Sequence, residues 1–458
     1  MRPAPEVVDE ALAAAGGDGC VVLVEEANEA EVRFANNTTT TNGVRLDRRV
    51  TVVRLAEVAG GVAPGVARRG GEVDVVALVA AAGEDARAGS PAEDAAPLVA
   101  GSEEPGFGRP PGRTDLSALA GVLAALGGAF GRARDADRVL SGFAEHRVAT
   151  TYLGTSTGLR RRHVQPTGAL HLVGRSGDGT RSSWAGTGGP TFAEDALDGL
   201  EERVVRGLGW AARRVDLPAG RYEVVLPPAA VADLMVGLAD AAGGREAEEG
   251  RTVFSAPGGG TRLGETLATL PFDLWSDPAA PGVACIPFLA AATSSPDVSV
   301  FDNGMAVERV DWVRGGRLHR LRYHRAGAAL SGVPATPPVD NLLLGLPGAT
   351  GTTEDLVART ERGLLLTCLW YIREVDPATL LLTGLTRDGV YVVEDGRVVG
   401  AANNFRFNES PVDLLARAAE AGAAERTLGR EFGEWVNRTC MPPLRVPDFN
   451  MSSVSQAS

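Results

Sequence analysis

Few residue patterns in this chain could support catalysis, and the most specific of them places a serine between two glycines. Residues 154–158 read GTSTG and match G-x-S-x-G, the turn that presents the nucleophilic serine of α/β-hydrolases. That turn requires a strand before it and a helix after it, whereas residues 159–164 (LRRRHV) continue as strand-like sequence. The pattern therefore predicts a β-turn, and Ser156 is not expected to act as a nucleophile.

The glycine and histidine patterns do not form a recognisable ligand site. The glycine run at 258–260 lacks the G-x-G-x-x-G spacing and precedes no predicted helix, so we interpret it as a loop. His319 and His324 are five residues apart and would point to opposite faces of a strand. No two histidines stand four residues apart on a predicted helix, so a histidine-based metal site is not expected. The five histidines are His146, His163, His171, His319 and His324.

Two carboxylates lie on a predicted helix that begins near residue 229. Its apolar face consists of Val231, Leu234, Met235, Leu238 and Ala242. Asp233 and Asp240 are seven residues apart and occupy nearly one side of this helix, so a catalytic carboxylate pair is conceivable. The alternative is that both residues flank the apolar face and point to solvent.

The basic and sulfur-containing residues exclude several mechanisms. All 45 basic residues are arginine, so Schiff-base chemistry, a P-loop lysine and a Ser–Lys dyad are excluded. The four cysteines are far apart without C-x-x-C pairing, which fits a reducing compartment and no disulfide framework. They are Cys20, Cys285, Cys368 and Cys440.

Charge and hydropathy indicate a cytoplasmic protein. The net charge of −13 disfavours direct nucleic-acid binding. The only basic run, RRRH at 160–163, is either an anion contact or part of a solvated strand. No signal peptide is recognised, and the apolar runs are interrupted before the roughly 20 residues that a bilayer requires, so no membrane association is expected.

The first half of the chain predicts a mixed α/β domain over residues 1–216. Helices are predicted at 6–15, 114–130 and 192–214, and strands at 21–25, 31–36, 44–55, 149–153, 161–164 and 169–174. Asn42-Gly43 predicts a turn, and residues 73–82 fit either a strand or a helix. Residues 83–112 contain few large apolar side chains, so a mobile loop is expected there.

The second half, residues 217–458, predicts an antiparallel, barrel-like β domain with few helices. Strands are predicted at 222–226, 252–254, 267–270, 283–289, 364–374 and 443–446, and helices at 229–242, 411–423 and 431–437. Hairpins are predicted across Gly315-Gly316 and Asp395-Gly396. The fold class predicted for the whole chain is α+β.

Several separated blocks occur in a characteristic order. They are residues 222–241 (YEVVLPPAAVADLMVGLADA), 299–328 (SVFDNGMAVERVDWVRGGRLHRLRYHRAGA), 370–410 (from WYIREVDPATLLLTG to AANNFRFNES) and 442–458 (PPLRVPDFNMSSVSQAS). Together they resemble the TldD/PmbA family, specifically its TldE (PmbA) branch of actinobacterial type. The first half, with FANNTTTTNGV and AEHRVATTYLGTSTG, is also similar to the first domain of that family.

The resemblance implies a heterodimeric peptidase whose TldD subunit is catalytic. That subunit holds zinc through an HExxxH helix and a later cysteine, which leaves one metal position for a nucleophilic water. At the aligned positions 236–241 this chain reads VGLADA, with neither histidine nor glutamate. Cys440 is the nearest residue to the third ligand, and an idle thiol is expected there.

The resemblance therefore implies a TldE-like subunit without catalytic, cofactor-binding or metal-ligating residues of its own. Its expected partners are a TldD-like subunit that carries the zinc and a peptide substrate, and neither nucleic acid nor membrane. Two alternatives stay open: a stand-alone hydrolase that uses Asp233 and Asp240, and a regulator that associates with DNA gyrase or other proteins.

Overall fold

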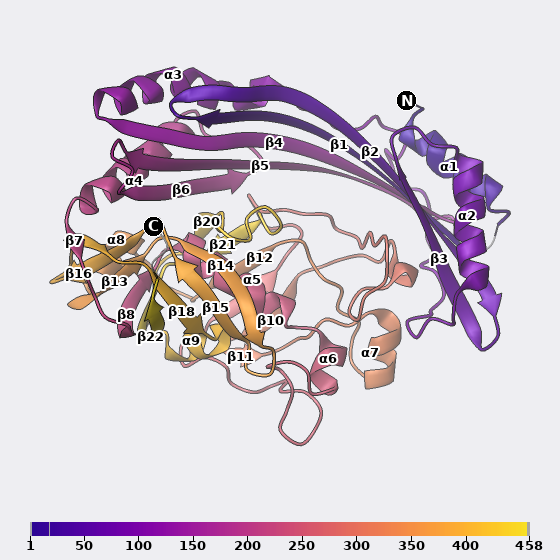
Figure 1. Ribbon diagram of the computed structural model, residues 1–458. Coiled ribbons are helices and arrows are strands. Elements are labelled where there is room, and N and C mark those ends of the chain that lie inside the picture. Colours follow the sequence, from indigo (N-terminus) through magenta and orange to yellow (C-terminus); the bar gives the residue numbers. More distant parts are fainter. Residues whose placement is uncertain (1, 18, 456–458) are drawn as a thin grey trace.

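The chain folds as a long curved sheet that lies over a β-rich body (Figure 1). The computed structural model describes residues 2–17 and 19–455, so the last residues of the closing sequence block lie outside the described part. The predicted α+β class is confirmed, and the first half contains more strand than the short predicted segments suggested.

The N-terminal sheet has six antiparallel strands in the order β3-β2-β1-β4-β5-β6. Their bounds are β1 Cys20–Ala35, β2 Thr38–Val58, β3 Gly61–Gly70, β4 Arg138–Thr155, β5 Arg160–Ser176 and β6 Ser182–Gly189. The predicted turn at Asn42-Gly43 is wrong, because both residues pair with β1 within β2. The chain reverses instead at Asn36 and Asn37, whose φ values of 51° and 57° suit asparagine.

Strand β1 is covered by other elements on both of its faces. Val22 and Val24 pack against α1 (Ala4–Ala14) and α2 (Val75–Ala88), so the ambiguous segment at 73–82 is a helix. Farther along the same face, Phe34 packs against α3 (Ala120–Asp135) and α4 (Ala196–Trp210). Val21 and Leu23 have the opposite parity and pack against the C-terminal body.

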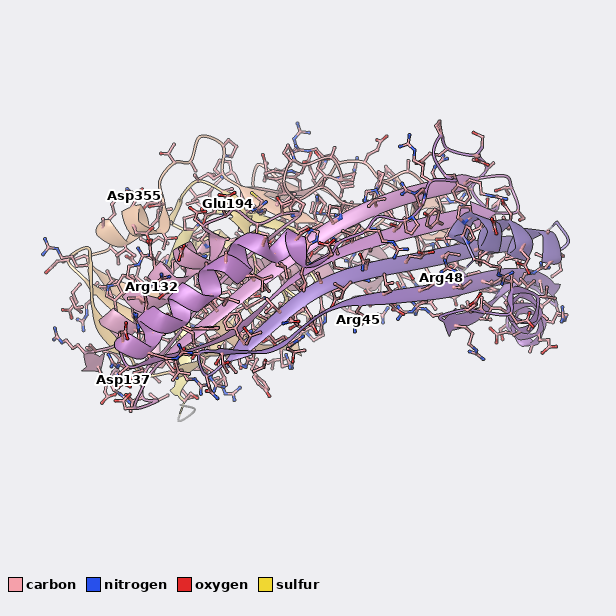
Figure 2. The ribbon with its side chains drawn as sticks, turned by 90° about the horizontal axis from the view of Figure 1, so that it is seen from above. Arg45, Arg48, Arg132, Asp137, Glu194 and Asp355 are labelled. Atoms are coloured by element: carbon pink, nitrogen blue, oxygen red, sulfur yellow. The ribbon has the colours of Figure 1, made fainter. Side chains whose placement is uncertain are left out.

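Helix α3 and the short 3-10 helix η1 (Leu116–Leu119) form one apolar helical stretch on the outer face (Figure 2). By length and composition, Leu116–Asp135 could cross a membrane, although the sequence predicted no segment long enough to do so. In this fold its apolar side, including Leu126 and Phe130, packs on the sheet and on α4. Arg132 at its end donates to Asp198 at 2.8 Å and to Glu201, which joins α3 to α4.

The expected loop at 83–112 begins later than predicted, because α2 continues to Ala88. The basic run at the start of β5 binds the rest of this loop. Arg161 donates to the Ser102 carbonyl oxygen at 3.1 Å, and Arg162 donates to that of Pro110 at 2.6 Å. Arg160 pairs with Asp9 of α1 at 3.1 Å. These contacts assign the RRRH segment to holding the loop and α1.

The C-terminal body contains two open sheets, and no closed barrel forms among the described residues. One sheet has the order β11-β10-β9-β12-β21-β20, and the other has the order β14-β15-β18-β22-β8-β13-β16-β17-β7, with β19 paired to β22. The strands of the first are β9 Asp273–Ser276, β10 Val310–Arg314, β11 Arg317–Leu318, β12 Leu342–Gly345, β20 Glu425–Thr427 and β21 Thr439–Met441. Those of the second are β7 Arg214–Val215, β8 Gly220–Leu226, β13 Arg362–Leu366, β14 Leu369–Asp376, β15 Leu381–Thr386, β16 Val390–Glu394, β17 Arg397–Ala402, β18 Phe405–Glu409, β19 Glu420–Ala421 and β22 Leu444–Val454.

Both predicted hairpins are present, as β10–β11 and β16–β17. The strands predicted at 252–254, 267–270 and 283–289 are wrong, because these segments lie in irregular backbone, and the helix predicted at 431–437 is a series of turns. The segment at 364–374 is divided between β13 and β14 instead of forming one strand. The helices are α5 Pro228–Asp240, α6 Gly244–Glu248, α7 Arg325–Ser331, α8 Thr353–Ala358 and α9 Pro411–Arg417, with the 3-10 helix η2 at Val300–Asp302.

The irregular segment that contains η2 joins the body to the N-terminal sheet. Phe301 is 1% exposed and belongs to one apolar cluster with Val21, Leu23 and Leu159. Residues nearly 300 positions apart in sequence therefore share one small core. This core fixes the far end of the curved sheet on the body.

Replacing Phe301 with alanine should lower the free energy of unfolding by about 3–5 kcal/mol, because it leaves a cavity in this core. Chemical denaturation would measure the loss. Leu330→Ala is the matched control, since Leu330 is 86% exposed and should change stability by less than about 0.5 kcal/mol. Equal effects of the two substitutions would show that the cluster does not hold the two parts together.

Candidate functional site

Helix α5 lies at the centre of the C-terminal body. Pro227 and Pro228 begin it, because their fixed φ suits the first helical turn and neither proline can extend strand β8. Val231, Leu234 and Met235 are completely buried in a cluster to which both C-terminal sheets contribute side chains. The helix is thus apolar on almost every side, and this makes its two aspartates conspicuous.

Asp233 is fully buried and binds the backbone of a distant turn. Its Oδ2 accepts from the N–H of Arg430 at 2.8 Å, and its Oδ1 accepts from those of Glu431 and Phe432 at 3.1 and 3.0 Å. Gly429 precedes this turn, and a Cβ there would lie 2.3 Å from Asp233 Oδ1. The expectation that Asp233 faces solvent is therefore wrong.

Burial raises the pKa of Asp233 to about 7, although the three N–H donors oppose the shift. Both oxygens of the carboxyl group accept hydrogen bonds from backbone N–H groups. No substrate could reach it without displacing the turn, so it anchors structure in this conformation.

The turn held by Asp233 carries Arg430 into the contact between the two halves of the chain. The Arg430 guanidinium lies 3.9 Å from the ring centre of Trp370 on β14 and 5.6 Å from that of Trp184 on β6. Trp184 in turn donates from Nε1 to His171 Nδ1 at 3.4 Å. Burial, with a smaller effect of Arg430, lowers the pKa of His171 to about 3, so this imidazole is neutral at physiological pH.

Asp240, two helical turns after Asp233, is exposed, as the solvent-facing alternative predicted, and it lines a separate cavity of about 90 Å³. Seven residues correspond to about 10 Å along the helix axis, and Asp233 is closed off by its turn, so the two carboxylates do not form a catalytic pair here. The other lining residues are Val236, Ala239, Ser276, Trp312, Arg322, Pro338, Val339, Asp340, Asn341, Leu342 and Val436. Desolvation raises the pKa of Asp240, and the Arg322 charge opposes the shift.

Of the three positions where the resemblance implies the residues of HExxxH, one belongs to the lining of this cavity. Val236 lines it, Gly237 follows on the helix, and Ala241 comes directly after the last helical residue. Within residues 2–17 and 19–455, no three His, Cys, Asp or Glu side chains group closely enough to bind a metal.

Cys440 does not face α5. Its neighbour Met441 is buried in the cluster that contains α5, whereas Cys440 packs with Val283 and Leu343 on the other face of β21. Burial raises the pKa of its thiol, so little thiolate forms at neutral pH.

The remaining sequence motifs have structural contacts. Ser156 sits in the turn between β4 and β5 and accepts from the Cys20 N–H at 3.1 Å, so the nucleophile turn is absent. His146 contacts Thr114 Oγ1 at 2.6 Å, and His324 accepts from the Gly327 N–H at the start of α7. The glycines at 258–260 form a loop with positive φ values.

Arg430, Trp184, Trp370 and Gly429 were not singled out from the sequence. Arg430 is 197 residues from Asp233, and no local pattern marks either residue as the other's partner. Asp233 itself indicates that such partners exist, because a carboxylate on an apolar helix face requires hydrogen-bond donors from elsewhere in the chain.

A profile of the PmbA/TldA metallopeptidase C-terminal domain matches residues 219–453, just over half of the chain. The chain belongs to the PmbA/TldD family. The family resemblance drawn from the sequence blocks is thereby confirmed. A comparison with curated proteins found no match.

Solved structures of this family share the fold over nearly the whole chain. TldE from Thermococcus kodakarensis has a TM-score of 0.78 at 17% identity and covers 97% of this chain and 99% of its own. A protein named as a candidate modulator of a DNA gyrase, from Thermotoga maritima, has a TM-score of 0.75 at 16% identity, with coverages of 97% and 99%. A similarly named protein from Bacteroides thetaiotaomicron has a TM-score of 0.74 at 15% identity, with coverages of 98% and 99%.

Replacing Asp233 with alanine should lower the free energy of unfolding by at least about 3 kcal/mol, because three buried N–H groups lose their acceptor. Chemical denaturation at pH 7.5 would measure this. Asp413→Ala is the control, since Asp413 is an exposed aspartate on α9 and its loss should cost under about 1 kcal/mol. Comparable losses would contradict the anchoring role of Asp233.

The raised pKa of Asp233 predicts a pH dependence of stability. Between the ordinary value of 3.8 and about 7, the folded protein retains a proton that the unfolded chain releases, so stability falls as pH rises through this window. Below pH 4 and above pH 7 the contribution is flat. The Asp233→Asn variant should lack this slope, so the difference between the two unfolding free energies, measured from pH 4 to 8, isolates it. A pH-independent difference would refute the assignment.

Proposed function

We propose that this chain is the TldE-like subunit of a heteromeric zinc peptidase in the cytoplasm. In this role it forms one wall of a shared chamber for peptides or unfolded polypeptides, and a TldD-like partner supplies the zinc. Membership of the family and the metallopeptidase description of its C-terminal domain support the reaction class.

The observation that carries the proposal is the composition of helix α5 in the matched domain. The positions aligned with the zinc-binding motif hold Val236, Gly237 and Ala241, none of which has a metal-ligating atom in its side chain. The helix nevertheless retains its buried packing between the sheets. A subunit that keeps the helix without the ligands fits a partner to the catalytic chain.

The free edge of β14 supports a role in holding extended peptides. Among the described residues β14 pairs only with β15, so its other edge can accept a strand. The N–H of Tyr371 already donates to Glu431 at 3.0 Å, but the exposed stretch at 373–375 continues beyond it. Tyr371 is 57% exposed and Trp435 is 76% exposed, which provides apolar side-chain surface near that edge.

The same residues connect this edge to the Asp233-anchored turn. Glu431 pairs with Arg373 of β14 at 2.9 Å, and the rings of Phe432 and Trp435 lie 6.0 Å apart. The turn therefore positions aromatic surface beside a strand edge. We name Tyr371, Phe432 and Trp435 the aromatic platform.

Purification of the chain alone and with its TldD-like partner tests the proposal. We expect the lone chain to contain no stoichiometric zinc and to cleave no peptide. We expect the assembled complex to contain zinc and to cleave peptide. Metal analysis and a fluorogenic peptide assay would be used, and removal of zinc by a chelator should abolish the activity of the complex. Stoichiometric zinc with peptidase activity in the lone chain would refute the proposal.

In the assembled complex, Trp435→Ala should raise KM for peptide at least about fivefold, because it removes most of the exposed aromatic surface of the platform. Leu330→Ala provides the control, as an equally exposed apolar residue outside the platform. Thermal denaturation should show both variants folded. An unchanged KM for Trp435→Ala would exclude the platform from substrate binding.

A further inference from the structure

The cavity beside α5 is built from fixed walls. Trp312 is 5% exposed and donates from Nε1 to Ser276 Oγ at 2.9 Å. Ser276 donates to the Asn341 carbonyl oxygen at 2.5 Å, and the Asn341 amide donates to the carbonyl oxygens of Asp277 and Val283 at 2.6 and 2.7 Å. These polar groups are already hydrogen-bonded within the protein and hold the wall in one conformation.

Charge is unbalanced around this cavity. Arg322 pairs with Asp297 at 2.6 Å, and Arg438 pairs with Asp340 at 2.7 Å. The side chain of Asp240 accepts no hydrogen bond from the described residues, because Arg322 donates to the Asp240 backbone carbonyl oxygen at 2.7 Å and acts on the carboxylate only through its charge. The charged residues that line the cavity are Asp240, Asp340 and Arg322, so the lining carries one excess negative charge.

We propose that this cavity binds a primary ammonium group of a peptide, with Asp240 as its counter-ion and Trp312 beside it. An ammonium is a compact cation that pairs with a carboxylate and is attracted to the face of an indole ring. The volume of about 90 Å³ equals roughly three waters, which is enough for an ammonium and a few methylene groups. Val236, Val339 and Leu342 offer apolar contact to those methylenes.

The ammonium can come from the amino terminus of a peptide or from a lysine side chain. The inference rests on the proposed function only in that the ligand is a peptide. A metal ion does not fit the same residues, because Asp340 is already paired and no third ligating side chain groups with Asp240 among the described residues.

Isothermal titration calorimetry of the full-length chain tests this with three alanine-rich pentapeptide amides. One has a free amino terminus, one is N-acetylated, and one is N-acetylated and carries a single lysine. We expect the free or the lysine peptide, or both, to bind roughly tenfold or more tightly than the acetylated lysine-free one. Which of the two binds identifies the source of the ammonium.

Substitutions then locate the binding site. Asp240→Asn should weaken binding of the ammonium peptide about tenfold, while Asp413→Asn leaves it unchanged. Ala239→Leu keeps the charge and fills the cavity, and it should weaken binding to a similar extent. Since Asp240 is exposed and Ala239 is half-buried, melting temperatures should confirm that both variants fold.

Equal affinity for all three peptides, no binding at millimolar concentration, or full affinity in Asp240→Asn would overturn the inference. Zinc binding to the lone chain that depends on Asp240 would also overturn it. The peptidase assay of the complex separates the two proposals. If the complex is active and Asp240→Asn leaves peptide binding unchanged, only the proposed ammonium site is refuted. If the chain binds the peptide through Asp240 but forms no active complex, only the proposed subunit role is refuted.

Discussion

The buried carboxylate of Asp233 is the constraint on which the centre of this protein depends. A charged or polar group inside an apolar cluster is costly unless donors surround it, and here three successive backbone N–H groups do so. That requirement fixes a turn from the far end of the sequence against α5. This turn places Arg430 between Trp184 and Trp370, one from each half of the chain.

This arrangement explains how one helix serves both architecture and function. The turn covers Asp233 in the middle of α5, while Asp240 at the C-terminal end of the helix lines a cavity. The helix carries valine at position 236 and glycine at position 237, and alanine follows it at position 241; none of these side chains has a metal-ligating atom. Its apolar side chains pack in one cluster with strands of both C-terminal sheets.

The N-terminal sheet depends on a second constraint, burial on both faces. Its outer face is covered by four helices, and part of its inner face packs on the segment around Phe301 (Figure 1). The 21-residue strand β2 is buried from Val50 to Val53, whereas its first ten residues have no buried side chain. The sheet therefore forms a roof over the body, and the aromatic platform lies beside the contact between them.

The sequence by itself determined the α+β class, both C-terminal hairpins, helix α5 and the family, because these rest on local periodicity, turn residues and ordered blocks. It also identified Asp233 and Asp240 as unusual residues on an apolar helix. Only the tertiary structure decided what each does, since the donors to Asp233 come from residues 430–432 and the walls around Asp240 come from several distant segments. Strand lengths and the face of Cys440 likewise depend on which distant elements cover each side of a sheet, and no local pattern contains that information.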